Sequence, residues 1–533
     1  MATTSLSDPG TSESGIPESI ISRWRHLQLL KTLLKMGVDI ANASSFLDLD
    51  RMPIYITSFW KHFDPQFPIL HKPTFAVEET HDLLLLAIFV TGAQILRRIQ
   101  GEQTTDTSPD FVIASDLRYE IYKMANSTPL VLWIPQALLI LEVYEMLCPT
   151  REIYRRECIH HDMLINLIQE AGWLTEPPST RAEPSWFEWA QREGARRVVF
   201  ATFYLDLIHA LTFSRPTKII VFGMHRRLPC DNAFWSAVSA EELSRVVSSR
   251  GREPQPFLRH CLDQVLQRQL VLTNPFGSNL VMASLLSMIW SRKQQELHVS
   301  LYGMTLQLDH DWRSTLLCAC GYWKQGLDEA YRTIDDGQPL PQAGDIMIES
   351  GTILYHLAYM VANVDITQCQ VYAGAGLRLG RDVSPSSYAA IPHMVKLWAR
   401  GSSAPSATFY ALKFLSRTVG SASYSARHDV LLHRPWALYL AALIVWCYGY
   451  AREGFIKSES DLSTTAARKE DMDLFLKRAN AVQSPDALHR LDGHNKCLGL
   501  LMELKEIFGC VKSAMLDEAN ALLENCCMML QGG

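Results

Sequence analysis

Apolar residues recur at three- and four-residue steps along most of the chain. Ile20, Trp24, Leu27, Leu30 and Leu34 begin this pattern, and their spacing places them on one face of a helix. Alternating apolar and polar runs bounded by hairpin turns are nearly absent, so the sequence predicts an all-α protein. Similar helical patterns follow at residues 80–99, 111–125, 132–147, 152–171, 186–213, 257–272, 279–300, 310–334, 346–362, 388–400, 405–420, 432–450, 467–479 and 498–528.

Proline, glycine and small polar residues mark the expected joints between these helices. Residues 1–18 are rich in Ser, Thr, Gly and Pro, which predicts a disordered tail. The stretch 337–345, GQPLPQAGD, is the best boundary between an N-terminal helical half at 19–336 and a C-terminal helical half at 346–533. A loop-rich segment is also expected at residues 216–256, and a polar loop at 454–466.

Two long apolar runs test whether the chain enters a membrane. Residues 83–96 and 436–450 are uncharged stretches of about 14 or 15 residues, short of the roughly 20 that span a bilayer. We therefore expect both runs to form buried core helices, and we expect no membrane contact.

Composition and charge narrow the possible classes of protein. A chain of 533 residues is long enough to bury a large core. With 50 Lys and Arg against 56 Asp and Glu the net charge is −6, which argues against nucleic-acid binding through the whole surface. The start MATTSLSDPG lacks the features of a secretory signal, and the 12 cysteines have no framework spacing, so we expect reduced thiols.

Catalytic and metal-binding signatures are mostly missing from the sequence. There is no G-x-S-x-G elbow, no H-E-x-x-H and no P-loop. Cys158 shares a helix face only with His161, so a structural role is favoured over a zinc site there. Asp206 and His209 also share a helix face, and a buried, hydrogen-bonded pair is favoured over an acid–base pair.

Residues 55–75, YITSFWKHFDPQFPILHKPTF, carry the most information. Tyr55, Phe59, Trp60 and Phe63 form an aromatic helix face, and Asp64-Pro65 ends that helix. Prolines and aromatic residues then predict an extended, packed connection with His71 and Lys72 at its centre. Packing alone explains this composition, without a ligand.

This stretch strongly resembles the regulatory domain, or middle homology region, of fungal-specific transcription factors. Four further stretches are similar to the family in the same order: Trp186–Trp189 with Glu193 and the pair Arg196–Arg197; Ser214-Arg215-Pro216; Leu228-Pro229-Cys230 with Trp235; and His433–Tyr439. The last stretch resembles the subgroup that carries two-Cys two-His zinc fingers. The resemblance covers roughly residues 50–450. The motif positions are Phe63, Pro65, Phe67, Pro68, His71, Pro73, Phe75, Arg196, Arg197, Asp206, Pro229, Trp235, Pro435 and Trp436.

The resemblance implies a large bundle of many antiparallel helices and a regulatory role in the nucleus. It implies contacts with the transcription machinery, control of a DNA-binding module, and a homo- or heterodimer. A paired Arg196 and Arg197 would seat a carboxylate such as Glu193. We expect no enzyme activity and no catalytic or cofactor-binding residues.

The sequence departs from the family at the zinc module. The first cysteine is Cys148, and residues 1–50 hold a single histidine, His26, so no zinc cluster or tandem finger fits there. No Lys/Arg-rich run resembles a nuclear import signal. We expect no cofactor in this chain, with zinc only in an upstream finger module if one exists. Three explanations stay open: a missing finger exon, DNA contact through a partner, or a diverted regulator that titrates a partner.

Two functional hypotheses follow. The first is a fungal transcriptional regulator of a dedicated pathway such as a secondary-metabolite gene cluster. The second is an all-α enzyme or small-molecule binder without DNA-binding activity, which requires an apolar pocket with converging polar groups. His71, His161 and Asp206 are the residues expected to line such a pocket.

Overall fold

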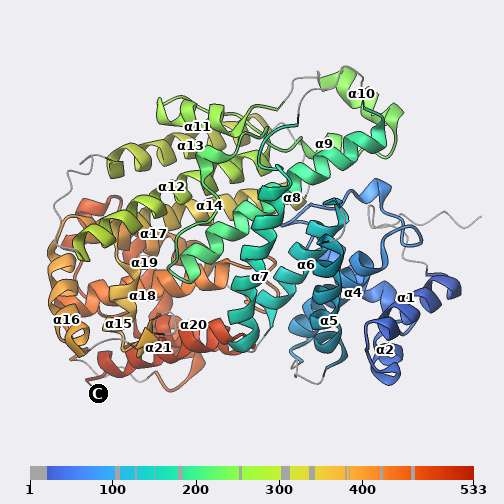
Figure 1. Ribbon diagram of the computed structural model, residues 1–533. Helices are drawn as coiled ribbons and strands as arrows, with labels where there is room; N and C mark the ends of the chain where they lie inside the picture. Colours follow the sequence, from blue (N-terminus) through green and yellow to red (C-terminus); the bar gives the residue numbers. More distant parts are fainter. Residues whose placement is uncertain are drawn as a thin grey trace, which may run out of the picture.

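The protein, seen in a computed structural model, is built almost entirely from α-helices (Figure 1). Among the described residues, strand structure is limited to the short antiparallel pair β1 (Leu377–Arg378) and β2 (Arg381–Asp382). The predicted all-α class is therefore confirmed. The structure describes residues 21–102, 108–126, 129–148, 151–177, 184–250, 255–301, 312–334, 342–378, 381–382, 385–420, 424–457 and 462–532.

The first helices form one side of the molecule (Figure 1). They are α1 (Arg23–Lys35), α2 (Ile40–Phe46), α3 (Met52–His62), α4 (Asp82–Gln100), α5 (Pro109–Ala125) and α6 (Trp133–Leu147). Helix α4 packs against both α3 and α6. Gly92 permits the α3 crossing, since a Cβ at this position would overlap the carbonyl oxygen of Tyr55. Between α3 and α4, the single turn η1 (Lys72–Thr74) interrupts the predicted extended connection.

Two long helices, α7 (Arg151–Glu170) and α8 (Trp186–Thr212), run through the middle of the molecule (Figure 1). Helix α8 begins at a capping box in which Ser185 and Glu188 satisfy each other's backbone N–H groups. It is buried almost continuously from Val198 to Leu211. The chain then turns sharply, with Ser214 at a left-handed φ of 51°. The side chains of this helix therefore pack against several neighbouring helices at once.

The segment predicted as loop-rich, 216–256, also contains short helical elements that the sequence pattern did not specify. Helix α9 (Asn232–Trp235) is a single turn capped by Asp231, and α10 (Ala240–Arg250) lies at the edge of the molecule. A further turn, η2 (Val221–Gly223), precedes them. The reason for the miss is that α10 is short and polar, so it lacks the broad apolar face that marks a core helix.

The remaining helices form the other side of the bundle. Helix α12 packs against α14, and α18 lies among α14, α17 and α21. The pattern at 498–528 predicted one helix, but the chain bends at residues 510–513 and forms two. The elements are α11 (Leu258–Leu266), α12 (Pro275–Leu301), α13 (Trp312–Ile334), α14 (Gln342–Asn363), α15 (Ile366–Tyr372), α16 (Pro385–Arg400), α17 (Ser403–Thr418), α18 (Arg434–Glu453), α19 (Thr465–Asn480), η3 (Pro485–Arg490), α20 (Leu498–Gly509) and α21 (Ala514–Leu530).

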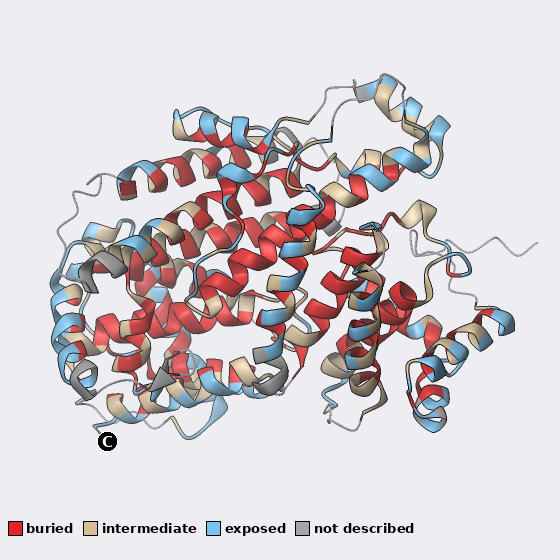
Figure 2. Cartoon of the chain, viewed as in Figure 1, coloured by how far each residue is buried: buried red, intermediate tan, exposed pale blue. Residues whose placement is uncertain are grey.

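A single hydrophobic core runs from Leu29 to Leu530, and its buried residues are most continuous on the helices in the middle of the molecule (Figure 2). Helix α18 is buried from Pro435 to Gly449, as expected for its apolar run. No helix in the described part of the chain is both long and apolar enough to cross a membrane. The division into halves at 19–336 and 346–533 stays a prediction, and the tail at 1–18 and most of the joint at 337–345 lie outside the described residues.

Candidate functional site

Three of the resembling stretches meet at one place, which we call the motif junction. It comprises residues 66–72, the first half of α8 (186–197) and the loop 228–235. The backbone of residues 66–72 is held from two sides. Gln136 donates to the carbonyl of Ile69 at 2.8 Å, and Arg197 donates to the carbonyl of Pro68 at 3.4 Å. Helix α8 therefore positions the connection between α3 and α4.

Arg197 is the central side chain of the motif junction and is buried. Its guanidinium donates to Glu193 at 3.0 Å and to the carbonyl of Cys230 at 2.9 Å. It also stacks on the Trp235 ring, 4.3 Å from the ring centre. A planar donor with several N–H groups suits this position, because it bonds a carboxylate and two carbonyls at once.

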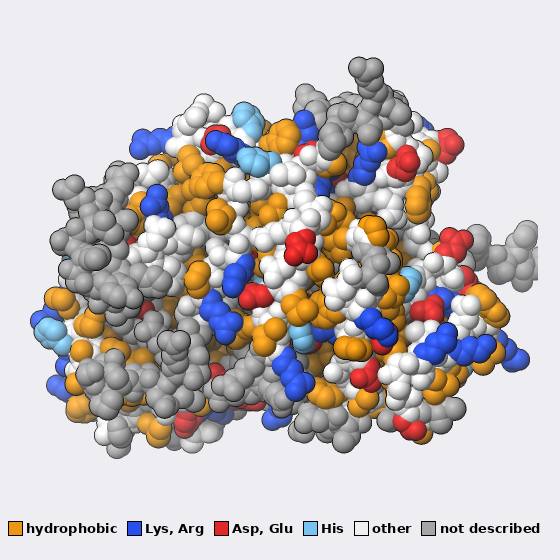
Figure 3. Space-filling model, in the orientation of Figure 1, with side chains coloured by type: hydrophobic (Ala, Val, Ile, Leu, Met, Phe, Trp, Pro, Cys, Tyr) orange, Lys and Arg blue, Asp and Glu red, His pale blue; other side chains and the backbone are white. Residues whose placement is uncertain are grey.

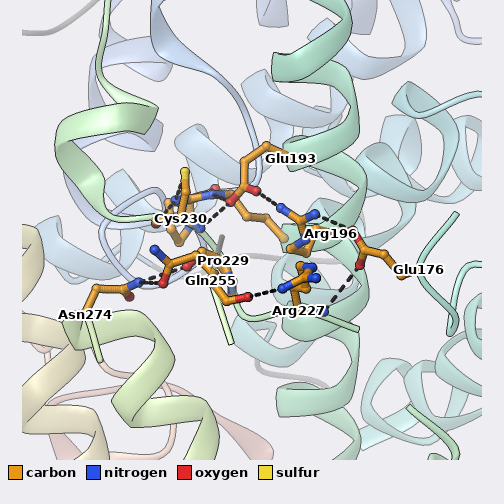
Figure 4. Close-up of polar contacts among 10 residues, drawn as sticks. Glu176, Glu193, Arg196, Arg227, Pro229, Cys230, Gln255 and Asn274 are labelled. Atoms are coloured by element: carbon orange, nitrogen blue, oxygen red, sulfur yellow. Dashed lines mark hydrogen bonds and ion pairs between the residues drawn. The ribbon is translucent and has the colours of Figure 1, made fainter. Parts of the chain in front are cut away.

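Glu193 is the carboxylate that the arginine pair was expected to seat. It is ion-paired with both Arg196 and Arg197, and it accepts the backbone N–H of Cys230 at 2.8 Å (Figure 4). Burial acts to raise its pKa, but the two guanidinium groups outweigh burial and hold the pKa of Glu193 below its usual value. The carboxylate therefore stays ionised inside the fold.

A second carboxylate, Glu176, extends the network outward (Figure 4). It accepts from Arg196 at 2.6 Å and from the backbone N–H of Arg227 at 3.3 Å. Pro229, another motif position, accepts from Asn274 at 2.8 Å. Charged side chains of α8 thus tie the loop 225–230 to the helices on either side.

His71 lies in an aromatic enclosure rather than in a ligand pocket. Its ring centre is 4.5 Å from that of Trp235, and the rings of Trp186 and Trp189 flank it at 5.6 and 6.2 Å. Its Nδ1 bonds the Thr74 hydroxyl at 3.0 Å. Burial lowers the pKa of His71 to about 4, so the ring is neutral near pH 7.

The other motif positions of residues 63–75 are packing residues. Phe63 packs against Phe67, whose ring meets Tyr204 of α8, and Phe75 packs edge-on against Trp60. Pro65 follows the end of α3, and Pro73 lies within η1. Beside them, Lys72 pairs with the buried Asp64 at 2.8 Å.

The C-terminal motif reaches α8 further along its length. The Tyr204 hydroxyl lies 3.2 Å from Nδ1 of His433 and 2.8 Å from the Ser350 hydroxyl, so it links α8 with α14 and the start of α18. Pro435 and Trp436 follow His433 and line a pocket between α8, α18 and α21, together with Glu157 and His209. Its cavity volume is about 40 Å³, far below the roughly 300–1,000 Å³ of ordinary ligand sites.

Asp206 and His161 belong to a separate buried group, which we call the carboxylate–histidine cluster: Glu142, Glu157, His161, Asp206 and His209. Asp206 accepts the backbone N–H groups of Lys218 and Ile219, both at 2.8 Å, and does not bond His209. His161 lies between Glu142, 2.7 Å from its Nδ1, and Asp206, 3.4 Å from its Nε2. The two predicted lining residues therefore lie in this cluster, whereas His71 lies in the motif junction.

The pKa values of several side chains in the carboxylate–histidine cluster are shifted far from their ordinary values. Burial lowers the pKa of His209 to about 3, and it raises the pKa of Glu157. Burial also opposes the charge on His161, but Glu142 and Asp206 outweigh it and raise the pKa of His161 to about 10. Cys158, the residue that shares a helix face with His161, is a buried thiol whose pKa burial raises to about 12.

The motif junction does not resemble an acid–base or nucleophilic centre. Cys230 is the thiol of the motif junction, and burial raises its pKa, so it remains a protonated, weak nucleophile. His71 has no carboxylate bonded to its ring to orient it as a base. The geometry of the junction is that of a structural clamp that fixes how segments far apart in sequence meet.

Sequence reasoning missed Glu142, Glu157 and Glu176. Glu142 gave a usable signal, because it is a lone carboxylate inside the apolar run ALLILEVYEML. Glu157 lies one helical turn before His161, which also could have been read from the sequence. Glu176 precedes a proline-rich loop and gave no signal.

The face drawn in Figure 3 shows no basic stripe of the kind that nucleic acids need among the described residues. On the face drawn in Figure 3, Lys and Arg side chains lie scattered among acidic and apolar ones, without a continuous basic stripe among the described residues. The fold and the motif junction thus define a large helical domain whose ordered motifs serve its internal architecture.

The comparisons with known proteins identify this domain. Residues 56–325 match the profile of the fungal specific transcription factor domain, about half of the chain, and the chain belongs to this family. The resemblance carried by residues 55–75 is thereby confirmed. Family membership places the chain among transcription factors and not among enzymes. No solved structure gives a significant match.

Curated relatives match over most of this chain. Zinc finger protein klf1 of Schizosaccharomyces pombe is 26% identical over 438 residues, 77% of this chain and 53% of the relative. Zinc finger protein zas1 of the same yeast is 25% identical over 433 residues, 77% and 46%. The nicotinate catabolism cluster-specific transcription factor of Emericella nidulans is 26% identical over 441 residues, 79% and 50%. The chain spans about half the length of these relatives.

Proposed function

We propose that this chain is a nuclear regulator of transcription that acts through its helical domain, by contacts with other proteins of the transcription machinery. The observation that carries the proposal is the family match at residues 56–325, the part of the chain that contains the motif junction. In the proposal, DNA is contacted through a zinc module that these 533 residues do not contain, on the same protein or on a partner. A homo- or heterodimer would bring such a module to the DNA.

Three features support indirect DNA contact. The relatives that match over 77% of the chain are named as zinc finger proteins, and this chain spans only half of them. Of its 12 cysteines nine are buried, and none is arranged with a second thiol and two histidines at finger spacing. The net charge of −6 fits a chain that does not hold DNA by itself.

The proposed target is a dedicated gene cluster. A relative from Emericella nidulans is named as specific to a nicotinate catabolism cluster, and it supports cluster-specific control as the type of regulation. Secondary metabolism is the kind of cluster that we propose for this chain, as an association at the level of the family. Transcript profiling decides between a biosynthetic and a catabolic cluster.

The test is to follow the tagged chain in its own fungus. Chromatin immunoprecipitation of the tagged protein is expected to recover a small set of promoters, and deletion of the gene is expected to change transcripts of one cluster. Reintroduced wild-type chain and Arg192→Ala, which alters an exposed residue of α8, should both restore those transcripts. Glu193→Gln, which weakens the motif junction, should not.

Two outcomes would contradict the proposal. An unchanged transcriptome in the deletion strain, together with a tagged chain that stays outside the nucleus, would remove the regulatory role. Tight, sequence-specific binding of a promoter by the purified chain without zinc would refute indirect DNA contact.

A further inference from the structure

The carboxylate–histidine cluster brings together ionisable side chains from three helices. Glu142 comes from α6, Glu157 and His161 from α7, and His209 from α8. Their exposed fractions are 1%, 0%, 2% and 6%, so water reaches almost none of them. Charged groups this deeply buried are normally paired or bound to a metal.

Two atoms in this cluster have no hydrogen-bond partner. They are Oε2 of Glu157 and Nδ1 of His209, whereas Oε1 of Glu157 contacts Nε2 of His209, and Nε2 of His161 faces Asp206 at 3.4 Å. Buried polar atoms in folded proteins are nearly always bonded, so two such atoms side by side require an explanation. Each of these atoms is also a good donor to a divalent cation.

Donor atoms of Glu142, His161 and His209 lie within 4.8 Å of one another, close to the separations of a metal site. One oxygen of Glu142 is 2.7 Å from Nδ1 of His161 and 3.7 Å from Nε2 of His209. Glu157 lies outside this group of three and contacts the same nitrogen of His209. In a tetrahedral zinc site with bonds of about 2.0–2.1 Å, neighbouring donor atoms are about 3.3 Å apart, so small side-chain rotations would admit an ion.

We propose that the carboxylate–histidine cluster binds one Zn²⁺ ion, with Glu142, His161 and His209 as ligands and Glu157 brought in as the fourth by rotation of its side chain. Zinc displaces the protons of Glu157 and His161 as it binds. Two carboxylates and two neutral imidazoles around the dication then give no net charge, which suits a buried site. Imidazole and carboxylate donors without thiolate fit zinc among the common divalent metals. The ion fixes α6, α7 and α8 to one another.

Asp206 supplies the outer support that such sites require. A histidine that binds a metal through one nitrogen usually gives its other N–H to a carboxylate. Nε2 of His161 faces Asp206 at 3.4 Å, and the backbone amides of Lys218 and Ile219 hold that carboxylate in place. The family-motif aspartate is therefore a positioning residue for the ligand His161.

The neighbouring pocket offers the ion a path into the carboxylate–histidine cluster, and it has room for a water molecule. Glu157 and His209 form part of its wall, and its cavity volume of about 40 Å³ exceeds the roughly 10–15 Å³ that one water molecule needs. A water molecule could thus enter as an additional ligand. This inference does not rest on the proposed regulatory function, and its failure would leave that function untouched.

The test uses the untagged full-length chain, stripped with a chelator and then dialysed against zinc. Elemental analysis is expected to find about one zinc per wild-type chain, and the added zinc should raise the thermal midpoint by several degrees. Glu157→Gln and His209→Gln should each lower zinc affinity at least tenfold. The matched control is His160→Gln, next to His161 on α7, where the ring bonds Glu145 at 3.0 Å and should leave zinc binding unchanged.

Two results would overturn the proposal. One is a wild-type chain that takes up less than a tenth of an equivalent of zinc; the other is a folded Glu157→Gln or His209→Gln variant that binds zinc as tightly as His160→Gln. If the variants do not fold, X-ray absorption on the zinc-loaded wild type decides. We expect a shell of nitrogen and oxygen at about 2.0–2.1 Å, whereas sulfur at about 2.3 Å would place zinc on the cysteines instead.

Discussion

The two halves of helix α8 bury charge in opposite ways. In the first half, Glu193 and Arg197 are almost inaccessible to water, and the contacts of the motif junction satisfy them. In the second half, His209 is similarly buried, but its Nδ1 and Oε2 of the neighbouring Glu157 lack hydrogen bonds. Burial of charge by itself therefore does not reveal a role. Whether the buried atoms are satisfied separates a structural clamp from a site that awaits a ligand.

This difference also explains why the pKa values of Glu193 and Glu157 are shifted in opposite directions. Opposite charges at bonding distance keep Glu193 ionised despite its burial. No such cation is bonded to Glu157, so burial raises its pKa and favours the neutral acid. Substitutions at the two carboxylates should consequently have unequal effects.

The largest effect is expected from Arg197→Ala. This change leaves Glu193 with one arginine, and it removes both the stacking on Trp235 and the bond to Cys230. Breaking a buried ion pair from one side costs roughly 3–5 kcal/mol of unfolding free energy. Urea unfolding measures it, with Arg192→Ala on the exposed side of α8 as the control, expected within about 0.5 kcal/mol. Equal losses in the two variants would mean that the junction is not a clamp.

A smaller effect separates the two carboxylates directly. Glu193→Gln removes the charge that two arginines share and should cost about 2–3 kcal/mol. In zinc-free protein, Glu157→Gln replaces a neutral acid with a neutral amide of similar shape and should cost less than about 1 kcal/mol. Chemical unfolding in the presence of chelator compares them. If both changes cost the same, the contrast between the two halves of α8 is wrong.

The motif junction should also weaken in acid through His71. Its pKa is about 4 in the folded protein, below the ordinary value of 6.5, so the unfolded chain binds more protons between these values. The contribution of the neutral ring is complete above pH 6.5 and is lost as the pH falls toward 4. We expect about 1–2 kcal/mol less stability at pH 4.5 than at pH 6.5 from this group.

His71→Gln is the variant that isolates this titration, since glutamine is polar but has no charged form. The difference in unfolding free energy between wild type and variant should shrink as the pH falls from 6.5 to 4.5. A difference that stays constant over this range would show that the ring is not held neutral by its enclosure.

The smallest effect is expected at the edge of the cluster. Lys218 pairs with Asp162 at 3.2 Å, with about half of each side chain exposed. Exposed pairs of this kind contribute about 0–1 kcal/mol. Lys218→Ala keeps the backbone N–H that holds Asp206, so its unfolding free energy should change by less than about 0.5 kcal/mol. A large loss would show that the side chain, and not the backbone, positions Asp206.

Much of the architecture could be predicted from periodicity. The ends of α4, α6, α8 and α18 lie within a few residues of the predicted ranges, because each helix has a continuous apolar face bounded by caps, prolines or glycines. Helix α10 was missed, since a polar edge helix leaves no such trace. The contact of Glu193 with the arginine pair could be predicted from the sequence, because i, i+3 and i, i+4 neighbours share a helix face.

The sequence alone therefore determined the all-α class, most helices, the motif order and the local ion pairs, because these depend on residues within a few turns of one another. Only the tertiary structure decided which faces meet. It enclosed His71 in tryptophans from α8 and α9, and it brought Glu142, His161 and His209 from three helices to one buried point. A periodic pattern shows which side of a helix avoids water, but it does not specify the neighbour that covers that side.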